Sequence, residues 1–213
     1  MLSTDPIHPD RAVLDKAAES LGRGEVVVAP TETRYGLLVR ADDQKYLEIL
    51  YALKGREGTK ATALLVRDLD DAGALGEMTP EALALAEHFL PGPLTLVLRA
   101  RRNWQPPRVV DGKIGVRWSS SPVIRGLMAK TSAPLTATSA NISGRADPES
   151  VEEIVSMFGD RISVYIDAGP LTGRTSTVVD CSTRKARILR EGAVPRAEIE
   201  RVLGDVDERR EKV

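Results

Sequence analysis

The sequence predicts an α/β fold in which a twisted, open, mixed β-sheet is flanked by helices. Short apolar runs typical of buried strands alternate along the chain with amphipathic segments of helical period. Helical segments are missing between the last strands, so a purely parallel sheet is not expected. The 213 residues suit one large domain, and a composition of 42% apolar and 29% charged residues is ordinary for a globular protein.

The individual elements follow from apolar periodicity and from capping residues. Thr-Pro-Glu at 79–81, Ser-Pro at 121–122 and Asp-Pro-Glu at 147–149 are typical helix starts, in which a capping side chain precedes a proline at the first helical position. The predicted helices cover residues 9–21, 43–53, 79–90 and 121–130, with two more that start at 147 and 195. The predicted strands cover residues 25–29, 36–39, 63–66, 94–98, 114–118, 135–138, 162–166, 177–179 and 187–189. We expect residues 1–204 to form the single domain and residues 205–213 to form a charged C-terminal tail.

Composition disfavours several classes of protein. The single cysteine, Cys181, allows no internal disulfide, and its place after an apolar run favours a buried thiol over a nucleophile. The two histidines, His8 and His88, stand far apart, so a zinc site is not expected. The chain does not begin with a signal-peptide pattern, and no apolar run approaches the ~20 residues of a membrane helix. We therefore expect a cytoplasmic protein with no membrane partner.

The charge balance argues against a non-specific nucleic-acid binder, because the net charge is −1. Six basic residues nevertheless gather between positions 99 and 117 against one acid, Asp111. They are Arg99, Arg101, Arg102, Arg108, Lys113 and Arg117. A solvated loop and a positively charged rim facing an anion both fit this cluster.

The common nucleotide-binding and nucleophile signatures are absent, since the chain has no Walker-type loop, no Gly-x-Gly-x-x-Gly after a strand and no serine elbow. Polar residues cluster instead in four segments at strand ends, where ligands gather in open α/β sheets. The segments are 30–37 (PTETRYGL), 54–56 (KGR) with Lys60, 138–144 (TSANISG), and 169–180 (GPLTGRTSTVVD) with 190–192 (REG). Each segment also has a purely structural interpretation: a polar turn, cations that offset a helix dipole, a hydroxyl-rich turn or a mobile loop.

Taken together, these segments resemble the YrdC/TsaC family of threonylcarbamoyl-AMP synthases. The likeness runs from about Gly24 to Val194, and its landmarks stand in the family's order. The remaining landmarks are FLPGPLTLVL at 89–98, GVR at 115–117 and LREG at 189–192. Each motif is weak alone, but six or more in order are specific, and the Lys-x-Arg and Ser-x-Asn pairs of the family are both intact.

The resemblance implies a YrdC-like fold with a concave, positively charged cavity. It implies a nucleotidyltransferase that joins L-threonine, bicarbonate and ATP into threonylcarbamoyl-AMP and pyrophosphate, with Mg²⁺ assisting. A tRNA-modifying threonylcarbamoyl transferase complex would be the partner that passes the group to an adenosine of tRNA, and direct contact with tRNA is left open.

The resemblance also assigns residues. Those implied at the reacting groups are Lys54, Arg56, Ser139 and Asn141. Those implied along ATP are Arg56, Lys60, Lys113, Ser139 and Arg190. Those implied to hold threonine are Thr33, Arg117 and Ser176, with Arg117 pairing with the threonine carboxylate. No metal ligand is identified.

Three cavity-side positions depart from the family pattern. Arg34 stands where a small apolar residue is usual, Leu65 where many relatives carry a histidine that faces threonine, and Ser121 in place of another histidine. Ser121 before Pro122 still suits a helix cap, whereas a new cation at Arg34 could shift substrate choice. Two alternatives therefore stay open: a divergent paralogue that binds an adenylated or carbamoylated small molecule, and a non-catalytic RNA-binding module. Scarce aromatic residues count against the RNA-binding module.

Overall fold

The structure is a computed structural model that describes residues 1–55, 62–101, 111–204 and 206–207. Its strands form one mixed sheet in the order β1-β8-β2-β3-β7-β4-β6-β5-β9-β10. The strands are β1 (Leu2–Ser3), β2 (Val27–Pro30), β3 (Tyr35–Leu38), β4 (Ala63–Leu65), β5 (Leu94–Arg99), β6 (Lys113–Arg117), β7 (Leu135–Ser139), β8 (Val164–Asp167), β9 (Thr177–Asp180) and β10 (Arg187–Arg190). The helices are α1 (Arg11–Gly22), α2 (Gln44–Lys54), α3 (Leu69–Leu75), α4 (Pro80–Phe89), α5 (Pro122–Lys130), α6 (Val151–Phe158) and α7 (Arg196–Leu203), with a 3₁₀ turn at Gly159–Arg161.

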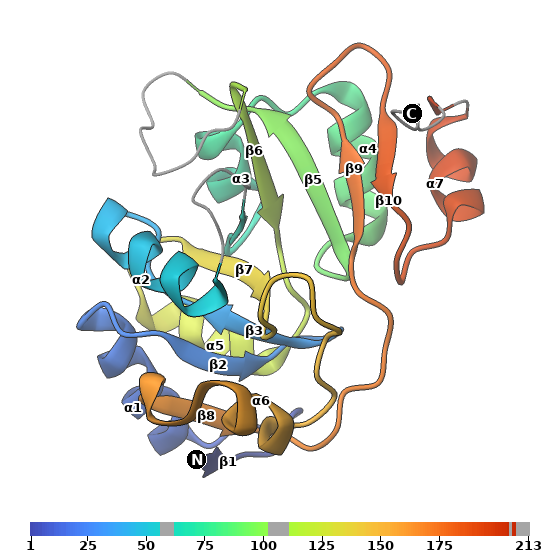
Figure 1. Ribbon diagram of the computed structural model, residues 1–213. Coiled ribbons are helices and arrows are strands. Elements are labelled where there is room, and N and C mark those ends of the chain that lie inside the picture. The colour runs from blue at the N-terminus through green and yellow to red at the C-terminus, as the bar shows by residue number, and fades with distance from the viewer. Residues whose placement is uncertain (56–61, 102–110, 205, 208–213) are drawn as a thin grey trace.

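The predicted fold class is confirmed, because this open sheet contains both parallel and antiparallel strand pairs. β2 pairs in parallel with β8, β5 pairs in parallel with β9, and β3 lies antiparallel to both β2 and β7. The sheet twists into two lobes (Figure 1). The first lobe holds β1, β8, β2 and β3 with α1, α5 and α6, and the second holds β6, β5, β9 and β10 with α3, α4 and α7. The neighbouring strands β7 and β4 join the two lobes.

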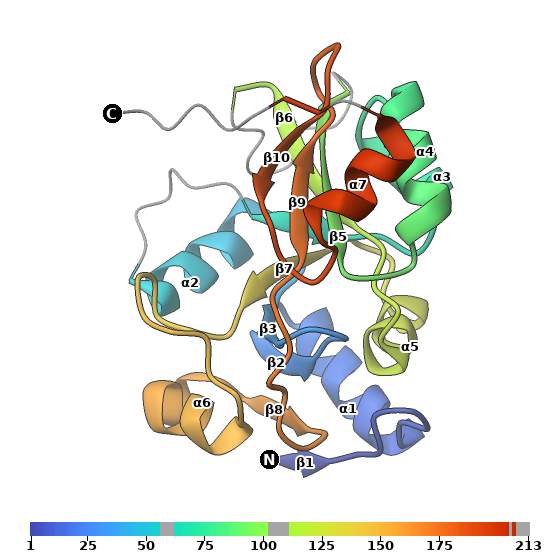
Figure 2. The ribbon, with the colours of Figure 1, turned by 90° about the vertical axis from the view of Figure 1, so that its right-hand side faces the viewer.

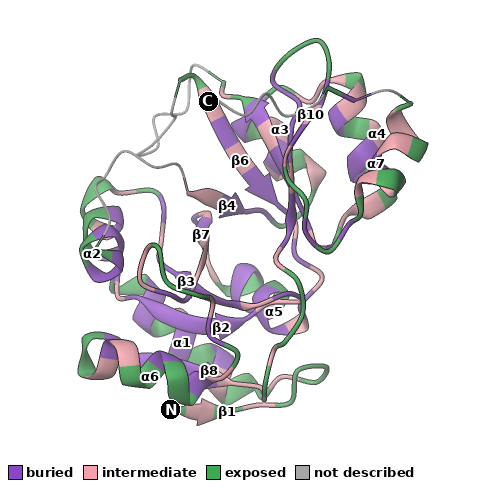
Figure 3. Ribbon diagram, turned by 45° about the vertical axis from the view of Figure 1, so that its right-hand side comes forward, coloured by how far each residue is buried: buried purple, intermediate pink, exposed green. Residues whose placement is uncertain are grey.

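The buried residues form two apolar clusters, and Figure 3 shows where buried residues lie along the ribbon. The smaller cluster lies between α1 and α5 and the strands of the first lobe, and Leu21, Val27 and Ile124 are among its members. The larger one includes the buried residues under α2 and α6 and those between α4 and the strands of the second lobe. Cys181 is fully buried in this larger cluster, as predicted, and burial raises the pKa of its thiol to about 12. Within the part of the chain described, no helix has the length and apolar character of a membrane span.

In the second lobe, the alternation of side chains along each strand separates the core from the site, because successive side chains of a strand point to opposite faces. On β5, Leu94, Leu96 and Leu98 are fully buried in the larger apolar cluster, which also holds the inner side of α4. Thr95 and Val97 point the other way and line a cavity. β6 and β9 follow the same rule, so one face of each strand builds the core and the other builds the cavity wall.

One strand, one helix and the 3₁₀ turn were not predicted from the sequence, and one predicted helix start is wrong. β1 is only two residues long, and α3 is a seven-residue helix that contains Gly73. The helix predicted to start at 147 instead begins at Val151. Ser150 is its cap: the Ser150 hydroxyl accepts from Glu153 N at 3.3 Å, and the Glu153 carboxylate accepts from Glu149 N at 3.2 Å. This reciprocal pairing is close to a capping box, and it displaces the helix start from the earlier Asp-Pro-Glu.

Most of the expected C-terminal tail lies outside the described residues. Of the part that is described, Val206 is buried in the larger apolar cluster, and Asp207 N donates to Ala186 O at 3.0 Å.

Candidate active site

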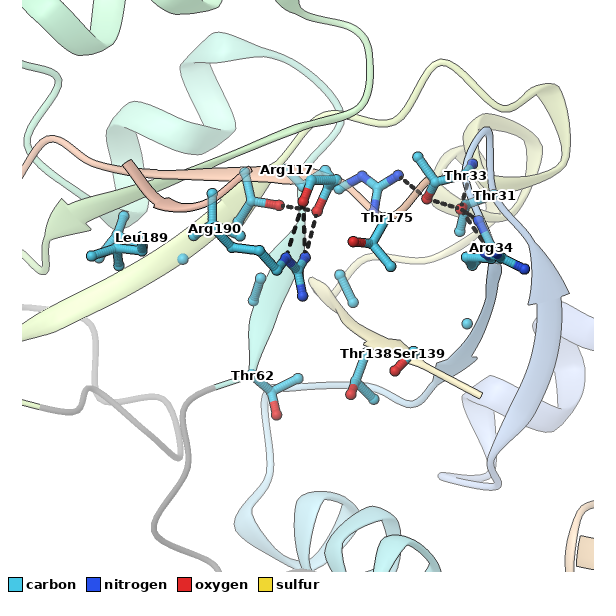
Figure 4. A pocket seen from close by; sticks show the side chains of 18 of the residues that line it. Thr31, Thr33, Arg34, Thr62, Arg117, Thr138, Ser139, Thr175, Leu189 and Arg190 are labelled. Atoms are coloured by element: carbon cyan, nitrogen blue, oxygen red, sulfur yellow. Dashed lines mark hydrogen bonds between the residues drawn. The ribbon is translucent and has the colours of Figure 1, made fainter. Parts of the chain in front are cut away.

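A cavity of about 660 Å³ opens between the two lobes and the joining strands (Figure 4). Its volume is in the range of small-molecule sites. Among the described residues that line it, six are basic and three are acidic, so the predicted concave and basic cavity is present. The basic residues are Arg34, Lys54, Lys113, Arg117, Arg187 and Arg190, and the acidic ones are Asp111, Asp147 and Asp180. This balance favours an anionic ligand.

Arg117, the last residue of β6, lies at one end of the cavity. Its Nη2 donates to Glu32 Oε1 at 2.9 Å and to Thr33 Oγ1 at 2.9 Å. The Arg117 and Glu32 side chains are only 9% and 13% exposed, and the Ser119 hydroxyl donates to the second carboxylate oxygen of Glu32. A guanidinium held from one side in this way keeps a fixed orientation, and its planar fork suits a carboxylate.

The turn between β2 and β3 carries Thr33 and is held by its own hydroxyl groups (Figure 4). Thr31 Oγ1 donates to Arg34 O at 2.7 Å, accepts from Thr33 N at 3.1 Å and lies 3.0 Å from Thr33 Oγ1. A threonine side chain that bonds nearby backbone groups is a common way of fixing a tight turn. The turn therefore presents Thr33 to Arg117 in one geometry.

Lys54 lies at the end of α2 and holds the loop that follows β7. Its ammonium donates to Ser139 O at 2.6 Å, to Asn141 O at 2.8 Å and to Asn141 Oδ1 at 3.0 Å. The Ser139 hydroxyl donates to the same Asn141 Oδ1 at 2.8 Å, and Asn141 Nδ2 donates to Arg145 O at 2.6 Å. An ammonium group has three N–H donors, and these three oxygens match them in number. Lys54, Ser139 and Asn141, three of the four residues implied at the reacting groups, thus form a single hydrogen-bonded unit in the cavity wall.

Ser176 and Arg190 form a third group, on the second lobe (Figure 4). The guanidinium of Arg190 donates to Ser176 O at 3.0 Å and to Ser176 Oγ at 3.1 Å, and Thr95 Oγ1 lies 3.1 Å from the same Ser176 hydroxyl. Burial lowers the pKa of the Arg190 guanidinium; the charge of Asp147 opposes this shift, and the charge of Arg117 adds to it. The two arginines thus belong to one cavity and repel each other, which a bound anion would relieve.

Lys113 on β6 and Asp180 on β9 pair with each other across β5, the strand between them. Lys113 Nζ lies 2.8 Å from Asp180 Oδ2, and Ser182 donates to Asp180 Oδ1 through its amide at 2.9 Å and its hydroxyl at 2.6 Å. Burial acts to raise the pKa of Asp180, but the hydrogen bonds from Lys113 and Ser182 outweigh it and hold that pKa below its ordinary value. Lys113 therefore lines the cavity as half of an ion pair.

The structure brings together all the predicted site residues that it describes. Thr33, Arg117 and Ser176 line the cavity, as do Lys54, Lys113, Ser139, Asn141 and Arg190. Arg56 and Lys60 lie outside the described residues. Glu32, Thr95 and Asp180 also contact this set and were not among the predicted site residues. Glu32 is inside a segment already singled out, and the period-2 pattern of β5 would have placed Thr95 on the cavity face.

The three departures from the family pattern have distinct surroundings. Ser121 accepts from Ile124 N at 3.5 Å and donates to Pro30 O at 3.0 Å, which confirms it as the cap of α5. Leu65 is buried in β4 and contributes an apolar patch to the cavity wall. The Arg34 guanidinium is engaged by Glu149 and by two backbone carbonyls, so its charge is already paired.

Comparison with known proteins agrees with this site. The Sua5/YciO/YrdC family model, described as telomere recombination, matches residues 19–192. The chain belongs to this family. The match covers every site residue discussed above, from the turn that carries Thr33 to Arg190.

Curated members of the family are similar over most of the chain. A threonylcarbamoyl-AMP synthase of Bacillus subtilis is 32% identical over 95% of this chain and 60% of its own length. One from Pseudoalteromonas translucida is 33% identical over 83% of this chain and 97% of its own length. The crystal structure of Pyrococcus abyssi Sua5 complexed with L-threonine superposes with a TM-score of 0.90 at 31% identity, over 98% of this chain and 62% of that one. The chain thus spans about 60% of the length of several relatives that it matches.

Proposed function

We propose that this chain is a threonylcarbamoyl-AMP synthase, which makes threonylcarbamoyl-AMP and pyrophosphate from L-threonine, bicarbonate and ATP. The observation that carries the proposal is one basic cavity in which a buried, oriented Arg117 and the Lys54–Ser139–Asn141 unit occupy separate walls. Relatives named for this activity are similar over most of the chain, one of them over nearly its whole length.

The Arg117 end of the cavity is proposed to hold the amino acid. The guanidinium would pair with the threonine carboxylate, because arginine and carboxylate match in charge and in planar geometry. The Thr33 hydroxyl accepts from Arg117, and the Ser176 hydroxyl lines the same cavity beside Arg190, so both can bond the polar groups of threonine. In Pyrococcus abyssi Sua5, which shares this fold, L-threonine is the bound ligand.

The nucleotide is proposed to lie beside the amino acid, along the part of the cavity that runs past Arg190 and Lys113 to the loop at Ser139. Fixed cations and hydroxyl donors suit phosphate oxygens, and the loop is held in place by Lys54. Arg56 and Lys60, the two other residues implied by resemblance, belong to the same proposal although they lie outside the described residues.

The proposed reaction has two steps. The threonine amine attacks the carbon of bicarbonate, a C–N bond forms, and water leaves, which gives a carbamate. A carbamate oxygen then attacks the α-phosphorus of ATP, the bond from that phosphorus to its β-bridging oxygen breaks, and pyrophosphate leaves. Both steps move negative charge among oxygens, so oriented donors and cations supply the stabilisation and the cavity supplies proximity.

Magnesium is proposed to arrive with ATP rather than to reside in the protein. In the described part of the chain, no three His, Cys, Asp or Glu residues gather into a metal site. The oxygens of Asp180 are engaged by Lys113 and Ser182. Mg²⁺ commonly binds through substrate phosphates with few protein ligands, and bound there it neutralises phosphate charge. We extend the proposal to a cytoplasmic location and to a tRNA-modifying transferase complex as the consumer of the product.

The test is pyrophosphate release from ATP with bicarbonate and each amino acid in turn. Release that requires both threonine and bicarbonate is the expected result, and Arg117→Met should reduce it about a hundredfold, the order expected when a charged hydrogen-bonding partner is removed. Arg67→Met is the matched control, because Arg67 pairs with Asp71 on α3 and lies outside the cavity wall. Release with another amino acid, or none while ATP still binds, would instead indicate the divergent paralogue.

A further inference from the structure

Two of the described cavity-lining cations, Arg187 and Arg34, have no part in the proposed reaction, and Arg34 is the more buried of the two. Arg34 stands in the turn between β2 and β3, and its side chain is 18% exposed. It extends from the turn towards residues 168–176, the connection from β8 to β9 that we call the crossing segment. Figures 1 and 2 show this segment passing from the first lobe to the second.

The guanidinium of Arg34 ties the turn to the crossing segment. Its Nη1 donates to Leu171 O at 2.9 Å and lies 3.1 Å from Glu149 Oε1, and its Nη2 approaches Thr172 O at 3.4 Å. Leu171 N in turn donates to Glu149 O at 2.8 Å. One side chain thus connects three elements distant in sequence: the turn, the start of α6 and the crossing segment.

A second anchor lies directly beside the first. The Tyr35 hydroxyl donates to Gly169 O at 2.6 Å and accepts from Ala168 N at 3.1 Å. Tyr35 is buried and belongs to β3, so this anchor is part of the sheet. The consecutive residues Arg34 and Tyr35 therefore fasten the crossing segment at two points.

The backbone of Arg34 leads to the amino-acid end of the cavity. Arg34 O accepts from Thr31 Oγ1, which contacts Thr33 Oγ1, and Thr33 Oγ1 accepts from Arg117. Gly173 of the crossing segment packs so closely on the turn that a Cβ there would lie 3.3 Å from Thr33 O. A shift of the turn relative to the crossing segment would therefore move the Thr33 hydroxyl away from Arg117.

We propose that Arg34 is a positioning residue, which locks the turn against the crossing segment and so sets the affinity of the cavity for the amino-acid substrate. Arg34 itself touches no substrate in this proposal. The inference rests on the proposed function for its substrate but not for its contacts. The sequence suggests that Arg34 could shift substrate choice directly, as an unpaired cation near the cavity. In this proposal it acts instead by holding the turn in place.

The test compares Arg34→Met with Arg34→Lys, which keeps one cationic donor, and with the control Arg67→Met. Arg34→Met should raise the KM for threonine about tenfold, the equivalent of one hydrogen bond, and leave kcat and the KM for ATP within about twofold. Arg34→Lys should recover part of the loss. Tyr35→Phe removes the second anchor and should raise the same KM, which keeps the proposal testable if Arg34→Met fails to fold.

Hydrogen exchange gives a readout that does not depend on activity. In Arg34→Met, amides of residues 168–173 should exchange about tenfold faster than in the parent or the control. Unchanged exchange there overturns the proposal even if the chain makes threonylcarbamoyl-AMP. A lower melting temperature with an unchanged KM also overturns it, because Arg34 would then only add stability. The parent chain is also tested for threonine binding in calorimetry and for pyrophosphate release. If it shows neither, the proposed function and the amino-acid part of this inference are overturned. The exchange result still decides whether Arg34 locks the turn against the crossing segment.

Discussion

Replacing Thr177 by valine removes one buried hydroxyl while keeping the shape of the side chain. Thr177 begins β9 and is 0% exposed. Its Oγ1 accepts from Gly192 N at 2.9 Å and from Val194 N at 3.1 Å, and it donates to Val194 O at 2.6 Å. These bonds hold the stretch that follows Arg190 against the strand that follows Ser176.

The expected loss of stability follows from those bonds. Valine leaves two buried N–H groups without their partner, and each such group costs about 1–3 kcal/mol. The sum, about 2–6 kcal/mol, is a large part of the ~5–15 kcal/mol that holds a typical domain together. For a chain of this size, a loss of ~3 kcal/mol corresponds to a fall in melting temperature of roughly 6–12 °C.

The measurement is urea unfolding followed by circular dichroism, with Thr177→Ser as the matched control. Serine keeps the hydroxyl and loses one methyl group, so it should cost only about 1 kcal/mol. Valine should therefore be the more damaging change although it is the more apolar residue at a buried position. A valine variant as stable as the serine variant would refute the reasoning that the hydroxyl holds this stretch.

Three further predictions concern single groups. Glu32→Gln weakens the ion pair that orients Arg117, so it should raise the KM for threonine about tenfold; an unchanged KM in the pyrophosphate assay would contradict this. The hydrogen bond from Arg23 lowers the pKa of Glu25 to about 2, so the stability that the Glu25 carboxylate contributes is present above pH 4.5 and is lost as pH falls towards 2. Glu25→Gln should therefore lose less stability than the parent between pH 5 and pH 3 in urea titrations. Equal losses of stability in the two chains would contradict this prediction. Cys181 should react with a thiol reagent at pH 8 only after unfolding, as mass spectrometry can check, and rapid labelling of the folded chain would show that the thiol is accessible.

Much of the fold could be predicted because local signals agree with the tertiary structure. The caps at Thr79 and Ser121 mark α4 and α5 as predicted, and the apolar runs mark the longer strands. The exceptions lack such agreement. β1 is too short to show a period, and α3 is a short helix interrupted by a glycine, so tertiary contacts decide both.

The residues that line the site could be predicted from the sequence, but the hydrogen bonds between them could not. Described motif residues from four separate segments do line one cavity, as expected from their place at strand ends. The direction of each bond was not predictable: Lys54 donates to backbone carbonyls of the Ser139–Asn141 loop, and Arg34 reaches across to the crossing segment. These partners are distant in the chain, and sequence spacing carries no information on which acceptor a long, flexible cation selects.

The alternation along β5, β6 and β9 has a consequence for how this chain tolerates changes in length. Each of these strands gives one set of side chains to the apolar core and the other set to the cavity. Inserting or deleting one residue inside β5 would turn Leu96 and Leu98 towards the polar cavity and Thr95 towards the core. A single indel there would damage stability and ligand binding together, whereas the same change in a loop need damage neither. Length differences that this fold accepts should therefore fall between its strands.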